Sequence, residues 1–177
     1  MSAVLAIDQG TTGTRALVVA ADGRLLGLGY REFTQHFPRP GEVEHDADEI
    51  FRVTLEAARE ALQQAKVVPA ALGVTNQRET VCVWERDTGR PIHRAIVWQD
   101  RRTAPRTQQL AKQRKGAYIR ERTGLVLDPY FSATKIEWLL QHVPGLERRV
   151  ASGERCSMGM PSPSASETSI VDDGAAQ

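Results

Sequence analysis

The stretch AIDQGTTGTR, residues 6–15, constrains the fold of this chain more than any other segment. It joins two short apolar runs, AVLAID and TRALVVA, and its glycines supply the backbone freedom that a tight turn needs. The two runs are therefore expected to form a hairpin. Asp22 and Gly23 give a second turn signal, after which LLGLGYREF has the composition of a third strand. The sequence predicts a three-strand meander at the start of a sheet.

Helical and strand patterns alternate after the meander. Asp46 and Glu49 resemble a capping box, and apolar residues recur at helical spacing from there to about Lys66. The runs ALGVTN, TVCVWE and PIHRAIVWQD have the composition of two or three more strands. The order of these elements predicts an α/β fold with a mixed sheet.

Two further helical segments are expected in the second half. Residues 101–122 have helical propensity and many basic side chains, which we interpret as a solvated surface face. SATKIEWLLQHV is typical of an amphipathic helix, with Ser132 as its N-cap and Pro144 and Gly145 ending it.

Composition excludes several classes of protein. The formal net charge of +1 gives no overall attraction to nucleic acid or membrane, and no apolar run reaches the roughly 20 residues that span a bilayer. The N-terminus has no basic segment typical of a signal peptide. Cys82 lies in a strand pattern and Cys156 in a polar segment, so no disulfide framework is expected. These features favour a cytoplasmic protein.

The polar residues of the first turn suit a phosphate and its metal. Glycine N–H groups and threonine hydroxyls donate to anions, and Arg15 adds a permanent charge. Asp8 would repel a phosphate unless a cation such as Mg²⁺ lay between them. The P-loop pattern GxxxxGK[ST] is absent. An ordinary Gly/Thr hairpin with an acid at its mouth explains this loop equally well.

A second polar group, Arg78 and Glu79, lies between two strand patterns in TNQRET. The pair is either a surface ion pair of little energetic value or a fork of donors and an acceptor for a polyol hydroxyl. Trp98 and Tyr130 supply aromatic rings that can cover a carbon chain, although such residues more often belong to a core.

Five segments in the same order resemble one family. AIDQGTTGTRALV, REFTQHFPRPGEVEHD, GVTNQRETVCVWE, AIVWQDRRTA and TGLVLDPYFSATKIEWLL are together similar to the glycerol kinases, which are carbohydrate kinases with the actin and hexokinase type of fold. TNQRET separates this family from the related pentulose and gluconate kinases. The resemblance implies a ribonuclease-H-like, actin-type ATPase domain, of which residues 1–154 form the N-terminal part.

The resemblance also implies an activity and roles for individual residues. The activity is ATP-dependent phosphorylation of glycerol to sn-glycerol 3-phosphate, and full-length relatives are homo-oligomers. On this basis Asp8 faces Mg²⁺, and Trp98 contacts the carbon chain of glycerol. The nucleotide phosphates are assigned to Thr11, Thr12, Gly13 and Arg15, and the glycerol hydroxyls to Arg78, Glu79 and Tyr130, with Thr11 also beside the substrate. Many relatives carry serine at the position of Gly13.

The end of the sequence departs from the family. Relatives are about three times as long, and their general base, an aspartate, comes much later. No residue here matches it, so neither Asp128 nor Asp172 is assigned that role. Residues 155–177 are rich in Ser, Pro and Gly and are expected to be a disordered, non-homologous tail. A frameshift near Arg155 is one explanation. Two alternatives to an enzyme therefore remain, an inactive polyol- or phosphate-binding remnant and a non-functional truncated product.

Overall fold

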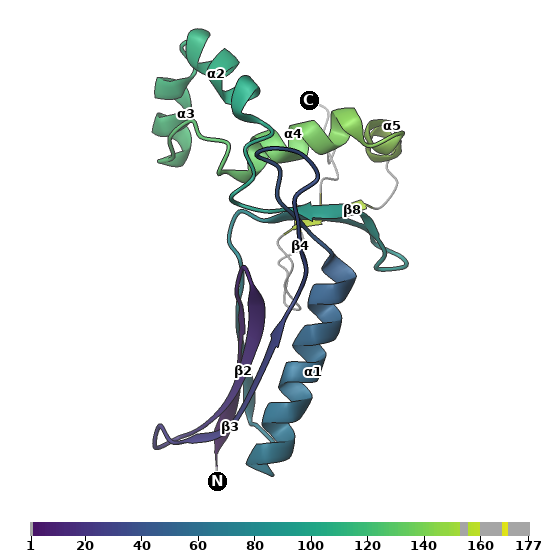
Figure 1. Ribbon diagram of the computed structural model, residues 1–177. Helices are drawn as coiled ribbons and strands as arrows, with labels where there is room; N and C mark the ends of the chain where they lie inside the picture. Colours follow the sequence, from purple (N-terminus) through teal and green to yellow (C-terminus); the bar gives the residue numbers. More distant parts are fainter. Residues whose placement is uncertain (1, 153–155, 160–167, 170–177) are drawn as a thin grey trace, which may run out of the picture.

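The chain forms two sheets with helices packed against each (Figure 1). The computed structural model describes residues 2–152, 156–159 and 168–169. The first sheet and the long helix α1 (Ala47–Ala65) lie at one end of the molecule, and the second sheet and the remaining helices lie at the other.

The first sheet begins with the predicted meander. Strands β1 (Ala3–Gln9), β2 (Gly13–Ala20) and β3 (Leu25–Glu32) pair antiparallel, and β6 (Ala71–Thr75) pairs parallel with the other edge of β1. The order β3-β2-β1-β6 makes this a mixed sheet, so the predicted α/β class and its opening meander are confirmed. Residues alternate between the two faces of each strand, and one face of β1 and β2 is buried under α1.

Helix α1 covers that face over the predicted range. Its N-cap is Asp46, whose side chain accepts hydrogen bonds from the N–H groups of Asp48 and Glu49. The carboxylate of Glu49 accepts from the N–H and hydroxyl of Thr34, so it ties the helix to the chain after β3 rather than completing a capping box. Lys66, with φ of 52°, ends the helix in a left-handed conformation.

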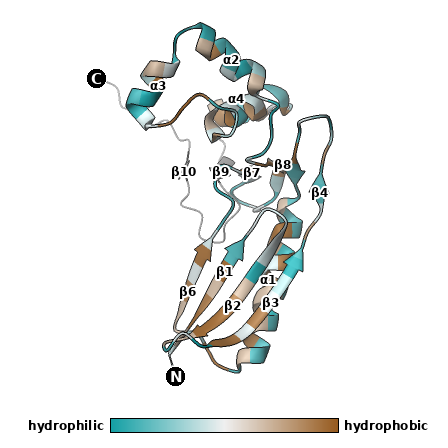
Figure 2. Cartoon of the chain, turned by 60° about the vertical axis from the view of Figure 1, so that its left-hand side comes forward, coloured by the Kyte–Doolittle hydropathy of each residue, from teal (hydrophilic) through white to brown (hydrophobic). Residues whose placement is uncertain are grey.

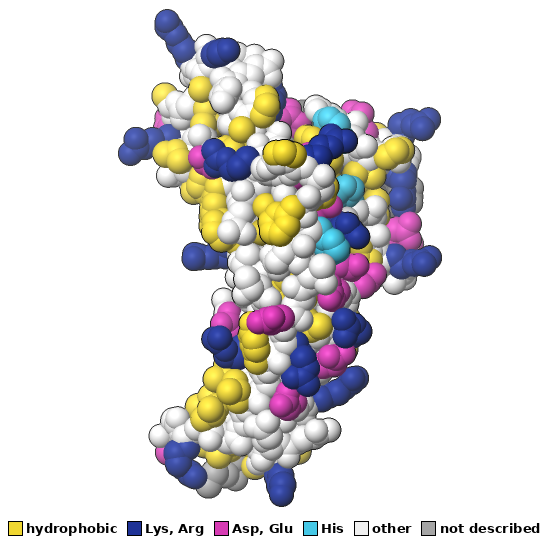
Figure 3. All heavy atoms as spheres, in the orientation of Figure 1, with side chains coloured by type: hydrophobic (Ala, Val, Ile, Leu, Met, Phe, Trp, Pro, Cys, Tyr) yellow, Lys and Arg dark blue, Asp and Glu magenta, His cyan; other side chains and the backbone are white. Residues whose placement is uncertain are grey.

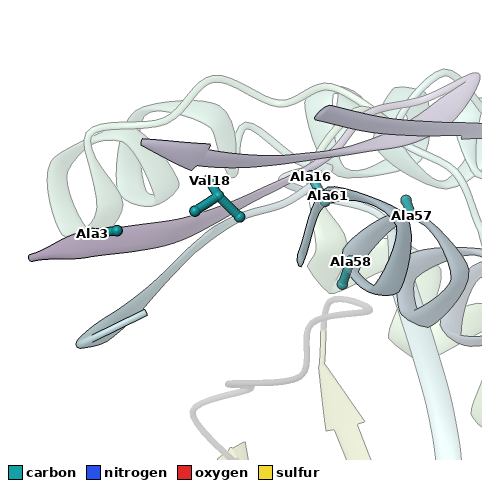
Figure 4. Close-up of a cluster of buried hydrophobic side chains, with 6 residues drawn as sticks. All are labelled: Ala3, Ala16, Val18, Ala57, Ala58 and Ala61. Carbon is teal, nitrogen blue, oxygen red and sulfur yellow. The ribbon is translucent and has the colours of Figure 1, made fainter. Parts of the chain in front are cut away.

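The core between α1 and the sheet is made of small side chains. Its buried members come from two strands and one face of the helix: Ala3, Ala16, Val18, Ala57, Ala58 and Ala61 (Figure 4). Gly27 and Gly29 allow β3 to approach the helix backbone directly. A Cβ on Gly27 would lie 2.0 Å from the Ala61 carbonyl oxygen, and a Cβ on Gly29 would lie 2.0 Å from that of Ala57.

The opposite face of the first sheet is open within the described part of the chain. Figure 2 shows β6, β1, β2 and β3 side by side with α1 along one side only. Val4, Leu28 and Tyr30 lie on the open face and are each about two fifths exposed. Strand β6 is largely exposed as well.

The later strands form a second sheet, which the sequence did not predict. Strands β7 (Val81–Glu85) and β8 (Pro91–Ile96) pair antiparallel, and the short β5 (Glu44–His45) and β4 (Gln35–His36) extend that sheet beyond β8. Of the strands expected after α1, only β6 joins the first sheet. Local composition marks a strand but not its partner, because pairing depends on contacts between distant segments.

Helices α4 (Ser132–His142) and α5 (Leu146–Ala151) pack on this second sheet. Leu139 and Leu146 are buried against Val81, Val83 and Ile96. The predicted cap of α4 is wrong. The N-cap residue is Phe131, whereas Ser132 is the first helical residue and its hydroxyl donates a hydrogen bond to Glu79.

The basic segment forms two helices rather than one, α2 (Ala104–Lys112) and α3 (Gly116–Thr123). Arg114, with φ of 59°, lies between them. Dark blue side chains project outward around α2 and α3 in Figure 3, as expected for a solvated face. Arg102 does not fit that interpretation, because its side chain is 3% exposed and is paired with Asp100 and Glu44. None of the described helices is long and apolar enough to cross a membrane.

The segment predicted to be a disordered tail contains two short described strands. β9 (Cys156–Gly159) pairs antiparallel with β7, and β10 (Thr168–Ser169) pairs with β9. These two segments therefore have regular structure where none was predicted. The rest of residues 155–177, including Asp172, lies outside the described residues. The proposed boundary after residue 154 and the frameshift remain predictions.

The close approach of α1 to β3 gives a test of the fold. We expect Gly29→Ala to lower the free energy of unfolding by about 1–3 kcal/mol, because the added Cβ meets a backbone carbonyl that cannot move alone. Gly73→Ala in β6 is the matched control, since its Cβ would meet nothing within 4 Å. Urea unfolding of both variants measures the difference, and equal stabilities would contradict this packing.

Candidate functional site

The turn between β1 and β2 meets the segment that follows β8. The N–H of Gly10 donates to the carbonyl of Gly13 across 3.0 Å, which closes the turn. The indole Nε1 of Trp98 donates to the hydroxyl oxygen of Thr11 across 2.9 Å, although these residues are 87 positions apart. The structure thus places a residue predicted to bind phosphate beside one predicted to contact substrate.

Asp8 and Arg15 lie opposite each other in the β1–β2 ladder, on the open face of the first sheet. Arg15 Nη1 is 3.8 Å from Asp8 Oδ2, and both side chains are about half exposed. The guanidinium also lies 5.7 Å from the centre of the Tyr30 ring. Such an exposed ion pair contributes roughly 0–1 kcal/mol to stability. Because the pairing is weak and both side chains are half exposed, both charges are accessible to a ligand.

Asp8 fits one kind of metal site only. Among the described residues, no three His, Cys, Asp or Glu side chains are grouped to hold a metal ion. Mg²⁺ is often held by one or two carboxylates together with phosphate oxygens and water. A single half-exposed carboxylate suits a cation that arrives with a phosphate, and it does not suit a cage built from protein ligands.

Gly13 has a steric reason to be glycine in this chain. A Cβ at this position would lie 2.6 Å from the Arg31 carbonyl oxygen and 2.7 Å from the Tyr30 hydroxyl. The neighbouring strand therefore lies against the base of the turn. Thr12 is exposed and Thr14 is buried, so of these two only Thr12 presents its side chain to solvent.

Glu79 is held in an uncommon conformation between β6 and β7. Its φ is +65°, a region that few residues other than glycine adopt. Its Oε2 accepts two hydrogen bonds from Ser132, one from the N–H at 2.8 Å and one from the hydroxyl at 2.6 Å. The carboxylate therefore lies at the N-terminus of α4, where the helix dipole favours negative charge.

The aromatic residues of the predicted polyol group are also together. The rings of Trp98 and Tyr130 meet edge to face, with centroids 5.8 Å apart. Tyr130 is fixed by its N–H, which donates to Asp128 Oδ1. That same oxygen accepts from Arg101 at 3.0 Å, so Asp128 stabilises a turn.

Arg78 is the exception among the predicted polyol residues. Its side chain is exposed, and it has no hydrogen bond or ion pair within the segments that the structure describes. It adjoins Glu79 in the sequence and presents its side chain to solvent.

Sequence reasoning missed Lys135, a fully buried lysine on α4. Its Nζ donates to the carbonyl oxygens of Glu79 at 2.8 Å and Tyr130 at 2.5 Å. One signal was present in the sequence. Lys135 lies four residues before Leu139, so both occupy the apolar face of the helix, where a lysine needs a partner.

Sequence reasoning also missed a second group, the buried His45 and its partner Gln35, which contacts the turn between β1 and β2. His45 is fully buried, and its Nε2 lies 2.7 Å from Gln35 Oε1. The amide of Gln35 in turn donates to the carbonyl of Thr11. Because Gln35 Oε1 can only accept, Nε2 of His45 carries the proton in this arrangement. Burial, with a smaller effect from His36, lowers the pKa of His45 to about 4.

Comparison with known proteins identifies the family of the chain. Residues 3–162 match the sequence profile of the FGGY family of carbohydrate kinases, N-terminal domain. The chain is 57% identical over 154 residues to a glycerol kinase of Bordetella pertussis, covering 85% of this chain and 30% of that protein. It is 56% identical over 153 residues to a glycerol kinase of Gluconobacter oxydans, with the same coverage. The chain thus spans about a third of the length of these relatives.

Solved structures show the same fold. A structure of Plasmodium falciparum glycerol kinase with ADP superposes with a TM-score of 0.86 at 32% identity, over 90% of this chain and 32% of that one. A xylulose kinase of Rhodospirillum rubrum superposes with a TM-score of 0.76 at 22% identity, over 81% of this chain and 30% of that one. The second likeness concerns the fold alone.

The buried His45 predicts how stability changes with pH. Between pH 4 and 6.5 the unfolded chain protonates this histidine while the folded chain does not, so the free energy of unfolding falls as the pH is lowered through that window. Across this whole pH window, the free energy of unfolding falls by about 3 kcal/mol because of His45. Urea unfolding at several pH values should show that His45→Gln loses this part of the slope and that His93→Gln, with a less buried ring, keeps it. Identical pH profiles for wild type and His45→Gln would contradict the prediction.

Proposed function

The chain belongs to the FGGY family of carbohydrate kinases, and from that premise we propose that it forms the N-terminal part of a glycerol kinase. The observation that carries this proposal is the hydrogen bond between Trp98 and Thr11. It joins the turn that suits a nucleotide phosphate to the residues that suit a polyol. A kinase needs its two substrates side by side, because the attacking hydroxyl must lie in line with the transferred phosphoryl group.

The polyol side of the proposed site recognises hydroxyl groups. Arg78 supplies donors, the carboxylate of Glu79 supplies an acceptor, and the phenol of Tyr130 does both. The indole of Trp98 covers the carbon chain. Support for glycerol in particular comes from the TNQRET segment and from the two relatives above, which are both glycerol kinases.

The nucleotide side takes the phosphates of ATP. Thr11 and Thr12 donate from their hydroxyls and backbone, Gly13 keeps its backbone N–H, and Arg15 adds a positive charge. Asp8 would hold Mg²⁺, which when bound offsets negative charge on the phosphates. The likeness to a glycerol kinase structure with ADP supports a nucleotide at this fold.

The proposed reaction also needs a general base and an adenine pocket, and no segment of this chain matches those parts of the family. The resemblance places the general base and the adenine pocket in later parts of the relatives, of which this chain spans about a third. Catalysis therefore depends on a second domain that closes on the residues described here. A cytoplasmic location and assembly into homo-oligomers remain predictions from the sequence.

A chimera tests the polyol assignment. Residues 3–154 would replace the aligned segment of the Bordetella pertussis glycerol kinase, whose remaining part supplies the second domain. We expect this chimera to phosphorylate glycerol and Glu79→Ala to raise its KM for glycerol by about 5–150-fold, because a hydroxyl donor loses its acceptor. Glu121→Ala is the control, since that carboxylate is exposed on α3. An unchanged KM for glycerol in the Glu79 variant would remove the residue from the site.

The 177-residue chain by itself tests the need for the second domain. We expect no measurable glycerol-dependent ADP release from the purified chain with Mg-ATP and glycerol in a coupled assay. Loss of a general base alone reduces rates by about 10²–10⁴-fold. Turnover near ordinary kinase rates, roughly 1–100 s⁻¹, would show that the chain is a complete enzyme.

A further inference from the structure

Lys135 is the largest fully buried side chain among the described residues, and it contacts the backbone of two residues of the proposed polyol site. Its ammonium group donates to two backbone carbonyls, those of Glu79 and Tyr130. These carbonyls belong to segments that are 51 positions apart in the sequence. The nitrogen also lies 6.0 Å from the centre of the Tyr130 ring.

Filling space in the core does not account for a lysine here. Removing an ammonium group from water costs several kcal/mol, whereas leucine or methionine would fill the same space on α4 without that cost. What a lysine adds is a group with three donors that can connect two separate backbone segments. The two segments that it connects carry Glu79 and Tyr130, two of the three residues proposed to hold glycerol hydroxyls.

The charge of Lys135 at neutral pH is consistent with this contact. Burial lowers its pKa to about 8, and the carboxylates of Glu79, Asp100 and Asp128 oppose that shift. Arg102 adds a smaller effect in the direction of burial. The amine therefore remains mostly protonated near pH 7, and it donates both hydrogen bonds as an ammonium group.

We infer that Lys135 is a positioning residue of the polyol site, which sets the separation between the Glu79 carboxylate and the Tyr130 phenol by holding both backbones. This inference rests on the proposed function, because the separation between the carboxylate and the phenol matters only if both groups bind one ligand. Glu79 is held in its left-handed conformation from two sides. Ser132 holds the carboxylate, and Lys135 holds the carbonyl.

The experiment uses the full 177-residue chain and NMR, so that it does not depend on activity. In Lys135→Met, we expect hydrogen exchange of the Ser132 N–H to become at least about tenfold faster, because the Glu79 backbone is released and its carboxylate no longer stays on Ser132. Amide signals of the first sheet, such as those of Ala16 and Val18, should stay unchanged. Lys112→Met, at an exposed position of α2, is the matched control and should leave Ser132 unchanged.

A glycerol titration of the same samples separates the two proposals. We expect added glycerol to shift the Trp98 indole signal in the wild-type chain, and the apparent dissociation constant to rise by about tenfold or more in Lys135→Met. If the wild-type chain shows no glycerol response while Ser132 loses protection in the variant, Lys135 does hold the Glu79 backbone, and it is the proposed glycerol binding by this chain that fails. If Lys135→Met keeps both the Ser132 protection and the glycerol affinity, the positioning role is overturned.

Two further measurements keep the inference testable if Lys135→Met does not fold. Lys135→Gln retains N–H donors for the carbonyls. Hydrogen exchange at Ser132 should therefore be slower in Lys135→Gln than in Lys135→Met. If Lys135→Met unfolds, Lys135→Gln should still have a folded first sheet. In the wild-type chain, the Lys135 ammonium protons should exchange with solvent much more slowly than those of Lys112. Equally fast exchange of the two ammonium groups would overturn the inference.

Discussion

The rest of the structure depends on the contact between α1 and β3 across Gly27 and Gly29. Because two glycines let the helix backbone rest on the strand, α1 lies close enough for its Thr54 to reach the sheet. The hydroxyl of Thr54 donates to the Ile50 carbonyl at 2.7 Å and accepts from the amide of Gln9 at 3.2 Å, and it lies 3.3 Å from the hydroxyl of Thr14. Gln9 and Thr14 flank the turn that carries the proposed phosphate contacts. Packing in the core therefore fixes both ends of the loop proposed to bind phosphate.

The second sheet fixes the other half of the proposed site through a network of buried charged side chains. Arg102 donates to the buried carboxylates of Asp100 and Glu44, and its guanidinium lies over the Trp138 ring at 4.6 Å. Asp100 also accepts from the N–H of Val43. A buried network of this kind adds little net stability, but it admits few alternative arrangements. Here it fixes the segment that leads away from Trp98.

Local sequence signals predicted the parts of the structure that depend on local causes. The meander follows from turn residues, and α1 follows from an Asp46 cap and a regular apolar face. The division into two sheets depends on pairing between distant strands, and no local pattern encodes it. Arg102 and Lys135 were missed for a similar reason. A basic side chain is assigned to solvent unless its buried partners are known, and those partners lie on other elements. The proposed site residues were found through their types and order, whereas the contacts that hold them required the structure.

The two halves of the proposed site are prepared to different degrees, and the chemistry of the two ligands gives a reason. A hydroxyl of glycerol carries no charge, so each of its hydrogen bonds adds little net free energy unless donor and acceptor are already in place. Glu79 and Tyr130 meet that requirement, because Ser132, Lys135 and Asp128 hold them before any ligand arrives. A nucleotide phosphate is a strong charge that attracts Arg15 and a cation over several ångströms. The loosely paired, half-exposed Asp8 and Arg15 can therefore rearrange around it. An uncharged substrate needs a rigid site more than a charged one does, and the contacts that hold Glu79 and Tyr130 follow that difference, whereas the exposed Arg78 does not.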